Sequence, residues 1–421
     1  MNNDGFPDLV VANYYLNTAS IFLNNGDATF RQVDDLPTGA RPNGIALADL
    51  NRDGRPDLVT ANASAGTVSV FLARPGGGFA AKTDFPAGRG ASFVVVADVN
   101  GDGLPDLITA NYSEDTVAIL RGRGDGTFLP RTTLATGRGP VALVAADFNG
   151  DGRPDLAVAN QETSFISLYF NRGNGAFAPR TDLACGASPR SLATADLNGD
   201  GLPDLVVGAG NAAAVSVLPG KAGGGFQPAV NFATAINPRC VVIADFNADG
   251  RYDLAVANSG SDNVSLLLGK GDGTFLPRQD FPFGANPRAL VGADFNRDGR
   301  PDLVAGNFRT SQLTSRVGAP GTGPVLSGNF LVAQRVATTD GTWTDADHDR
   351  LSFGYQWQRS PDARDASAIG IPGANAASHQ LTVAESGSFV RALITATDGF
   401  GGTTTAPTGW RHVQPPPPAR R

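Results

Sequence analysis

A nine-residue segment rich in side-chain oxygen atoms, Asp-x-Asn-x-Asp-Gly-x-x-Asp, recurs along this chain of 421 residues at a fixed step of 49. The six complete copies begin at Asp49, Asp98, Asp147, Asp196, Asp245 and Asp294. A shortened seventh copy opens the chain, with Asn2, Asp4, Gly5 and Asp8 at the corresponding positions. A chemical group repeated this regularly constrains both the ligand that it binds and the fold that presents it.

The oxygen atoms of this segment are spaced to surround one hard cation. In the third complete copy, the side chains of Asp147, Asn149, Asp151 and Asp155 and the carbonyl of Arg153 would converge on one ion. Oxygen ligands at alternate positions are the set that Ca²⁺ prefers, and the glycine at position six lets the backbone fold around it. We therefore predict one calcium ion in each loop. No glutamate stands at position twelve, so the loop joins two strands and suits extracellular calcium, at about 10⁻⁴ to 10⁻³ M.

The predicted calcium ligands occupy the first, third, fifth and ninth positions of each loop. They are Asn2, Asp4 and Asp8 in the shortened copy, then Asp49, Asn51, Asp53 and Asp57, Asp98, Asn100, Asp102 and Asp106, Asp147, Asn149, Asp151 and Asp155, Asp196, Asn198, Asp200 and Asp204, Asp245, Asn247, Asp249 and Asp253, and Asp294, Asn296, Asp298 and Asp302. Ordinary Asp/Asn-Gly turns are the alternative, but copies in register with a full ligand set favour the metal. Because every loop joins two strands in the same way, calcium with a structural role is favoured over regulatory or ligand-bridging calcium.

The residues between these loops predict short strands. In the third complete copy, 141–146 lead into the loop, 156–159 follow it, 165–170 run to a Gly-rich turn and 179–183 return to the next copy. Such β-branched and aromatic runs, separated by turn residues, are typical of an all-β protein. One phenylalanine per repeat keeps the same period and should pack between adjacent sheets. These residues are Phe30, Phe79, Phe128, Phe177, Phe226 and Phe275.

Four-stranded units of this length, arranged radially, form a β-propeller. The seven motif copies predict seven blades over residues 1–320, of which the first lacks its inner strand. In the last blade, 313–317 are expected to supply a third strand. A linear solenoid is the alternative for such a period, but ring closure covers both faces of every sheet without special caps.

Residues 323–412 have a different pattern, which predicts a β-sandwich. Tyr355-Gln-Trp357, followed by a Leu-x-x-x-Glu-x-Gly-x-Phe that ends at Phe389, resembles bacterial immunoglobulin-like modules. The resemblance implies that Trp357 anchors the core. It also implies a tyrosine at Phe389 and a cysteine at Arg391, so the tyrosine-corner hydroxyl and the disulfide of that family are missing. Residues 413–421 form a proline-rich tail.

Residues 2 to about 307 resemble the FG-GAP/VCBS repeats of integrin-α-like propellers. The resemblance rests on the calcium loop and on the Gly-x-Phe turn, such as Gly126-Thr-Phe128. It implies a propeller with structural calcium. Proteins of this kind include adhesion receptors, fungal lectins and accessory domains of secreted bacterial enzymes, and the fold alone does not choose among them.

The composition excludes several functions. A net charge of −7 and a pI near 5.0 argue against a nucleic-acid partner. No run of 18 apolar residues exists, so we expect no membrane insertion. No signal peptide is present, and since the chain opens within a motif we expect a missing upstream segment and an extracellular or cell-surface location. His348, His379 and His412 all fall outside the repeats, which argues against catalysis there.

A set of arginines lies before the predicted inner strands, on the face opposite the calcium loops. They are Arg41, Arg89, Arg138, Arg190, Arg239 and Arg288. Around a ring opening they could bind carboxylates or sulfated sugars in bidentate fashion. The alternative, that each arginine pairs with an acidic neighbour or is solvated, is the more common fate of surface arginine. Variable residues on the same face are expected to set specificity, and they include Tyr14, Tyr15, Tyr112, Glu114, Gln161 and Glu162.

Taken together, these patterns predict a non-enzymatic, calcium-stabilised extracellular module that binds a glycan or a protein. The alternative is an accessory propeller of a larger secreted enzyme whose catalytic part lies upstream.

Overall fold

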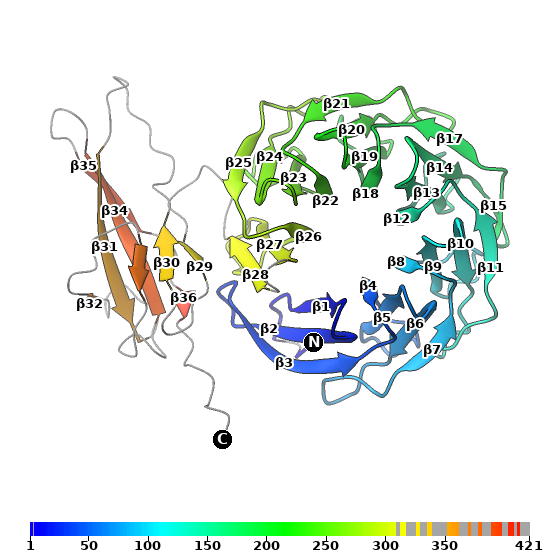
Figure 1. Ribbon diagram of the computed structural model, residues 1–421, viewed down its shortest axis with the longest axis horizontal. Coiled ribbons are helices and arrows are strands. Elements are labelled where there is room, and N and C mark those ends of the chain that lie inside the picture. Colours follow the sequence, from blue (N-terminus) through cyan, green and yellow to red (C-terminus); the bar gives the residue numbers. More distant parts are fainter. Residues whose placement is uncertain are drawn as a thin grey trace.

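The computed structural model describes residues 1–2, 4–308, 312–316, 326–328, 335–338, 352–361, 369–371, 378–380, 389–397, 403–407 and 411–412. These residues form strands, turns and bends, and no helix long and apolar enough to cross a membrane is found among them. Up to Arg316, apart from one small hairpin, the strands form seven antiparallel sheets arranged radially around a central opening (Figure 1). The predicted seven-bladed propeller is therefore confirmed.

Four strands, ordered from the centre of the ring outward, make up a typical blade. Blade 2 contains β4 (Pro42–Ala48), β5 (Asp57–Asn62), β6 (Thr67–Phe71) and β7 (Thr83–Pro86). Blade 3 contains β8 (Ala91–Ala97), β9 (Asp106–Asn111), β10 (Thr116–Leu120) and β11 (Thr132–Ala135). Blade 4 contains β12 (Pro140–Ala146), β13 (Asp155–Asn160), β14 (Phe165–Tyr169) and β17 (Thr181–Ala184), with a small hairpin of β15 (Asn171–Gly173) and β16 (Ala176–Phe177).

The next blades repeat this order. Blade 5 contains β18 (Pro189–Ala195), β19 (Asp204–Ala209), β20 (Ala214–Leu218) and β21 (Val230–Ala233). Blade 6 contains β22 (Pro238–Ala244), β23 (Asp253–Asn258), β24 (Asn263–Leu267) and β25 (Gln279–Pro282). The second strand of each is buried along its whole length, because it has a neighbour on both sides and blades on both faces.

The first and last blades are shorter. Blade 1 contains β1 (Leu9–Asn13), β2 (Thr18–Asn24) and β3 (Phe30–Pro37), which correspond to the second, third and fourth strands of the other blades. Blade 7 contains β26 (Pro287–Ala293), β27 (Asp302–Asn307) and β28 (Gln312–Arg316), the first three strands. The described part of blade 1 thus has no inner strand, as the sequence predicts.

The ring closes where blade 1 meets blade 7. Leu9 and Ala28 of blade 1 share an apolar cluster with Phe295 and Val304 of blade 7. The Nδ2 of Asn24 donates a buried hydrogen bond of 2.8 Å to the carbonyl of Phe295. This junction buries apolar surface as the other blade interfaces do, so seven blades complete the ring.

The periodic phenylalanines fill the space between blades. Phe128 of blade 3 packs edge-on against Phe85 of blade 2, with ring centroids 5.2 Å apart. Phe275 of blade 6 contacts Phe232 of blade 5 in the same manner, at 5.0 Å. The predicted packing of one aromatic ring per repeat between adjacent sheets is therefore confirmed, and such edge-to-face pairs stabilise beyond their buried area.

The remaining described strands form two further sheets. One contains β29 (Leu326–Gly328), β30 (Arg335–Thr338) and β33 (Ser378–Gln380). The other contains β31 (Ser352–Ser360), β32 (Ile369–Gly370), β34 (Phe389–Thr397), β35 (Thr403–Pro407) and β36 (Arg411–His412). Trp357 is buried, as predicted. An immunoglobulin-like domain stays a prediction, and the tail 413–421 lies outside the described residues.

Candidate functional site

The nine-residue loops connect the first strand of a blade to the second, and all lie on one face of the ring, here called the motif face. In blade 2 the carboxylate of Asp49 accepts the backbone N–H of Asp53 at 3.0 Å and that of Gly54 at 2.8 Å. Asn51 accepts the N–H of Asp53 at 3.1 Å and donates to its carboxylate at 3.0 Å. A positive φ of 80° at Gly54 allows this tight path.

The other complete loops repeat this geometry closely. The first aspartate accepts the N–H of the position-six glycine at 2.7 or 2.8 Å in each of them. The φ of that glycine stays between 77° and 83°. Because sequence, dihedral angles and hydrogen bonds all recur, the motif face presents nearly the same loop around most of the ring.

The ninth aspartate has a role that the sequence analysis did not anticipate. Asp155 is fully buried, and its carboxylate accepts the N–H of Phe148 at 3.0 Å and that of Asn171 at 2.7 Å. The first amide belongs to the loop and the second follows the third strand, so this carboxylate fastens the loop to the middle of the blade. Asp57, Asp106, Asp204 and Asp253 make the same pair of bonds.

Burial raises the pKa of these ninth-position carboxyl groups. For Asp253 the pKa rises to about 6, first because burial disfavours the charged form and then because Asp249 and Asp245 repel it. Backbone N–H donors at Gly269 and Phe246 work in the opposite direction. The three aspartates of one loop are thus close enough to sense one another's charge.

The donor set of these loops fits a calcium ion in its chemistry, since every predicted side-chain ligand offers oxygen. Their oxygen atoms, however, are turned toward backbone N–H groups. Within the described residues, no group of three His, Cys, Asp or Glu side chains is close enough to hold a metal ion. An oxygen atom that accepts one hydrogen bond keeps a second lone pair, so calcium ligation by positions one, three, five and nine stays a prediction.

The opposite face of the ring, here called the variable face, carries the loops between second and third strands and the connections between blades. The residue that follows the second strand varies from blade to blade, with six residue types in seven blades. In chain order these residues are Tyr14, Ala63, Tyr112, Gln161, Gly210, Ser259 and Phe308. Both hydrophobic and polar side chains therefore occupy one geometrical position, in contrast to the uniform motif face.

The six predicted arginines separate into two groups, which corrects their assignment to equivalent connections. Arg41, Arg89 and Arg138 do lie in the connections, one or two residues before β4, β8 and β12. The other three, Arg190, Arg239 and Arg288, are each the second residue of an inner strand, namely β18, β22 and β26. The Pro-Arg dipeptide that opens those strands shifts the arginine along the repeat by two or three positions.

Two of the connection arginines have local partners. Arg89 donates its backbone N–H to Glu114 at 2.9 Å, and its side-chain Nε lies 3.7 Å from the same carboxylate. The guanidinium of Arg41 lies over the ring of Tyr14, with its carbon 5.5 Å from the ring centroid. Pairing with a neighbour, the alternative weighed for the arginines, thus holds for Arg89.

A side-chain pair bridges two blades on the variable face. Tyr112, after β9, donates its hydroxyl to a carboxylate oxygen of Glu162, after β13, at 2.5 Å. This hydrogen bond to an anion raises the pKa of Tyr112. Both residues were predicted to contribute to specificity, and the structure brings them together.

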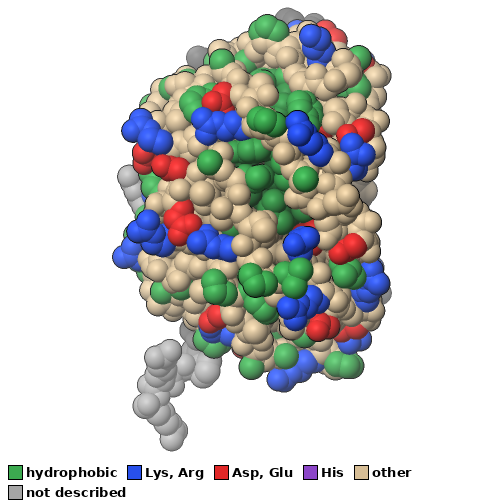
Figure 2. All heavy atoms as spheres, turned by 90° about the vertical axis from the view of Figure 1, so that its right-hand side faces the viewer, with side chains coloured by type: hydrophobic (Ala, Val, Ile, Leu, Met, Phe, Trp, Pro, Cys, Tyr) green, Lys and Arg blue, Asp and Glu red, His purple; other side chains and the backbone are tan. Residues whose placement is uncertain are grey.

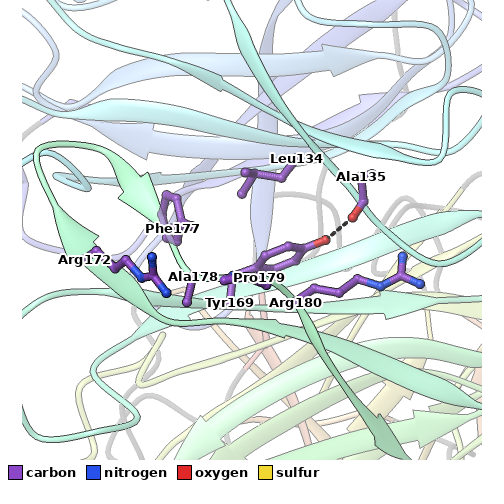
Figure 3. A pocket seen from close by; sticks show the side chains of 8 residues that line it. All are labelled: Leu134, Ala135, Tyr169, Arg172, Phe177, Ala178, Pro179 and Arg180. Carbon is purple, nitrogen blue, oxygen red and sulfur yellow. Dashed lines mark hydrogen bonds between the residues drawn. The ribbon is translucent and has the colours of Figure 1, made fainter.

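A shallow pocket on the outer rim was missed by the sequence analysis. It lies between β11 of blade 3 and the segment from β14 to β16 of blade 4, with a volume of about 540 Å³ (Figure 3). Tyr169 donates its hydroxyl to the carbonyl of Ala135 at the pocket floor, and burial raises the tyrosine pKa to about 12. Arg172 and Arg180 stand on its sides. The sequence does carry a signal, because blades 1, 2, 3, 5 and 6 have Phe or Leu at the position of Tyr169.

The rim around this pocket is mixed in charge. Figure 2 shows Lys and Arg side chains interspersed with Asp and Glu, and apolar side chains gathered along the middle of the view. Because both signs of charge are interspersed on this rim, its electrostatics does not indicate a particular class of ligand.

Six overlapping stretches of the chain match the model of the FG-GAP-like repeat, at residues 1–60, 50–109, 98–158, 147–207, 196–256 and 245–305. The chain belongs to the FG-GAP-like repeat family. No curated protein matches its sequence. The family match covers the motif loop of every blade, so the resemblance to FG-GAP repeats, inferred from that loop and the Gly-x-Phe turn, is confirmed for the propeller.

Solved structures with the same fold have unlike functions. An Agrocybe aegerita lectin that recognises non-reducing terminal N-acetylglucosamine is 20% identical, with a TM-score of 0.52 over 77% of this chain and 87% of the lectin. A putative 6-phosphogluconolactonase from Bacteroides uniformis is 16% identical, with a TM-score of 0.57 over 72% and 90%. BBS1N in complex with ARL6DN is 16% identical, with a TM-score of 0.51 over 74% and 88%. At such identities the likeness concerns the fold alone.

Proposed function

We propose that this FG-GAP-like propeller is a non-enzymatic extracellular binding module, stiffened by calcium on its motif face, that recognises a glycan or a protein through its variable face. The observation that carries the proposal is the contrast between the two faces. A loop that is the same in nearly every blade suits a structural task, whereas a position that holds six residue types in seven blades suits recognition of an asymmetric ligand.

The likeness to solved structures is compatible with this proposal. One of them is a lectin and another is a protein in complex with a protein partner. The likeness to a putative 6-phosphogluconolactonase leaves an enzymatic use of the fold as the alternative. Here the buried aspartates of blades 2 to 6 accept backbone N–H groups that fasten the motif loops, and this engagement supports binding over catalysis.

The direct test probes glycan and extracellular-matrix protein arrays with the full chain in millimolar calcium. We expect binding to at least one ligand, reduced at least tenfold by the double substitution Tyr112→Ala and Glu162→Ala on the variable face. The matched control is the double substitution Arg123→Ala and Thr127→Ala, which changes a turn on the motif face. Equal loss in both variants, or no binding to any member of the arrays, would contradict the proposal.

Calcium stoichiometry tests the other half of the proposal. Titration calorimetry on the chelator-treated protein should count several equivalent sites. The substitution Asp151→Ala should lower that count by one and leave the remaining sites unchanged, since each loop is a separate unit. A count of zero in the unaltered protein would remove calcium from the proposal.

A further inference from the structure

Three arginines lie side by side on one half of the ring opening. Arg190, Arg239 and Arg288 hold the same position, the second residue of the inner strands β18, β22 and β26. These strands are consecutive around the central opening, and β22 packs against both of the others (Figure 1). In blades 2, 3 and 4 the corresponding residues are Asn43, Ser92 and Val141. Positive charge at this level of the opening is therefore confined to blades 5 to 7.

Two of the three side chains are half-buried and have no counter-charge among the described residues. The Nε atoms of Arg190 and Arg239 are inaccessible to solvent and have no hydrogen-bond partner. No ion pair joins either guanidinium to a described residue. Arg89, by contrast, lies near the carboxylate of Glu114. A buried polar hydrogen without an acceptor costs free energy, and a charged one costs more.

The surroundings of these two side chains also disfavour their positive charges. The pKa of Arg239 falls to about 10, first because burial disfavours the charged form and then because Arg190 and Arg288 repel it. Burial also lowers the pKa of Arg190, against which only Tyr112 acts favourably. Like charges held together in a half-buried position are what an incoming anion would neutralise.

Neighbouring residues leave room for Arg190 and hold Arg288 in place. Gly210 follows the second strand of blade 5, and a Cβ atom there would lie 2.4 Å from Arg190 Nε, so the glycine leaves room for the arginine. Arg288 lies over the ring of Phe308, 3.5 Å from its centroid, and its Nε donates to Asn286 at 2.8 Å. The guanidinium group of Arg288 is thereby held before any ligand arrives, which lowers the entropy cost of binding.

Aromatic side chains extend the site beside Arg288. Tyr15 is 71% exposed and lies 5.8 Å from Phe308, measured between ring centroids. Tyr14 packs edge-on against Tyr15 at 5.1 Å. Rings that present an apolar face and a polar edge to solvent are suited to a ligand that is itself amphipathic, such as a sugar ring. Charge and aromatic surface are therefore contiguous across blades 5, 6, 7 and 1.

From this arrangement we infer that Arg190 and Arg239, with Arg288 beside them, bind an oxyanion, a carboxylate or a sulfate ester, carried by an acidic saccharide whose sugar rings contact Tyr15 and Phe308. Guanidinium groups match the paired oxygen atoms of such anions and form short, strong hydrogen bonds with them. The inference deepens the proposed function, on which it rests, by naming the class of ligand and the half of the variable face that holds it.

Binding of the full chain to dextran sulfate, to polygalacturonic acid and to uncharged dextran tests the inference. Dextran sulfate and polygalacturonic acid represent the two oxyanions. We expect binding to at least one acidic polymer and none to dextran. The substitution Arg239→Gln should weaken it about tenfold or more, whereas Arg123→Gln, which removes the same charge from an exposed turn on the motif face, should change it less than about twofold. Equal weakening by both variants, or binding to poly-glutamate as tight as to the polysaccharides, would overturn the inference.

A thermal measurement separates this inference from the proposed function. Sodium sulfate stabilises most proteins through exclusion from their surface, so the readout is the difference between proteins at equal ionic strength. Sulfate should raise the melting temperature of the unaltered chain by several degrees more than that of the double variant Arg190→Gln and Arg239→Gln. Equal gains would overturn the anion site, even if an array ligand were found. A larger gain for the unaltered chain, with every array empty, would keep the anion site and contradict the binding module.

Discussion

The two faces of this propeller follow the same repeat with different strictness. On the motif face, the first aspartate accepts the N–H of the position-six glycine at nearly the same distance in each complete loop. On the variable face, one position is occupied by Tyr, Ala, Gln, Gly, Ser and Phe in different blades. Strict repetition therefore accompanies contacts that every blade needs for folding, and divergence accompanies surfaces that only some blades use.

The largest expected effect follows from removing calcium, because it acts on every motif loop together. A chelator should lower the melting temperature of the chain by roughly 10 °C or more, since each ion at 100 times its Kd adds about 2.7 kcal/mol. Differential scanning calorimetry with and without EDTA measures this shift. Added magnesium is the control and should restore little of the loss, since it prefers a more rigid octahedral site. A melting curve that EDTA leaves unchanged would mean that the motif face is uniform for hydrogen bonding alone.

The ninth aspartate provides the next largest effect. The substitution Asp155→Ala leaves the N–H groups of Phe148 and Asn171 without their acceptor in a fully buried position. We expect a loss of about 3 kcal/mol or more in the free energy of unfolding, from two hydrogen bonds to a charged group. Urea denaturation measures it. The control is Asp182→Ala on the outer strand β17, whose carboxylate is partly exposed and should matter much less.

The sequence predicted the propeller well because its signals are local and repeated. The ring, the blade number, the missing inner strand of blade 1 and the interblade phenylalanines all follow from one period. The double hydrogen bond of Asp155 was not predicted, because a motif of alternating oxygen ligands resembles a metal site whether or not a carboxylate also caps two amides. That bond reaches Asn171, a residue sixteen positions away that the motif does not include.

The pairing of the arginines, in contrast, could not be predicted from the sequence. Six arginines near the starts of inner strands suggest one ring, yet Pro189-Arg190 and Arg41-Pro42 place the charge on different residues of the repeat. Only the structure shows that Arg190 and Arg239 share a half-buried place without a counter-ion, while Arg89 meets Glu114. Pairing depends on neighbouring blades, so it cannot be predicted within one repeat.

A smaller effect on stability, but a clear one on binding, is expected from Gly210→Ala. The new methyl group would lie where Arg190 Nε now lies, and a flexible side chain can move aside at little cost. The free energy of unfolding should change by less than about 1 kcal/mol, whereas binding of acidic polysaccharide should weaken severalfold. Gly208→Ala in β19, where the obstacle is Ser191 rather than an arginine, is the control. Unchanged polysaccharide binding in the Gly210 variant would argue that the position of Arg190 is irrelevant.

The smallest effect is expected at the bridge between blades 3 and 4 on the variable face. Tyr112→Phe removes the hydroxyl that donates to Glu162, a pair near solvent whose partners can both turn to water. The free energy of unfolding should therefore change by no more than about 0.5 kcal/mol, as for most surface substitutions. Urea denaturation of this variant beside Tyr169→Phe, whose hydroxyl is bonded at the floor of the rim pocket, gives the comparison. Because the buried tyrosine loses a bond that water cannot replace, Tyr169→Phe should be the more costly of the two. A larger loss of stability at Tyr112 would mean that this part of the variable face stabilises the ring. The assignment of stability to the motif face and recognition to the variable face would then be wrong at blades 3 and 4.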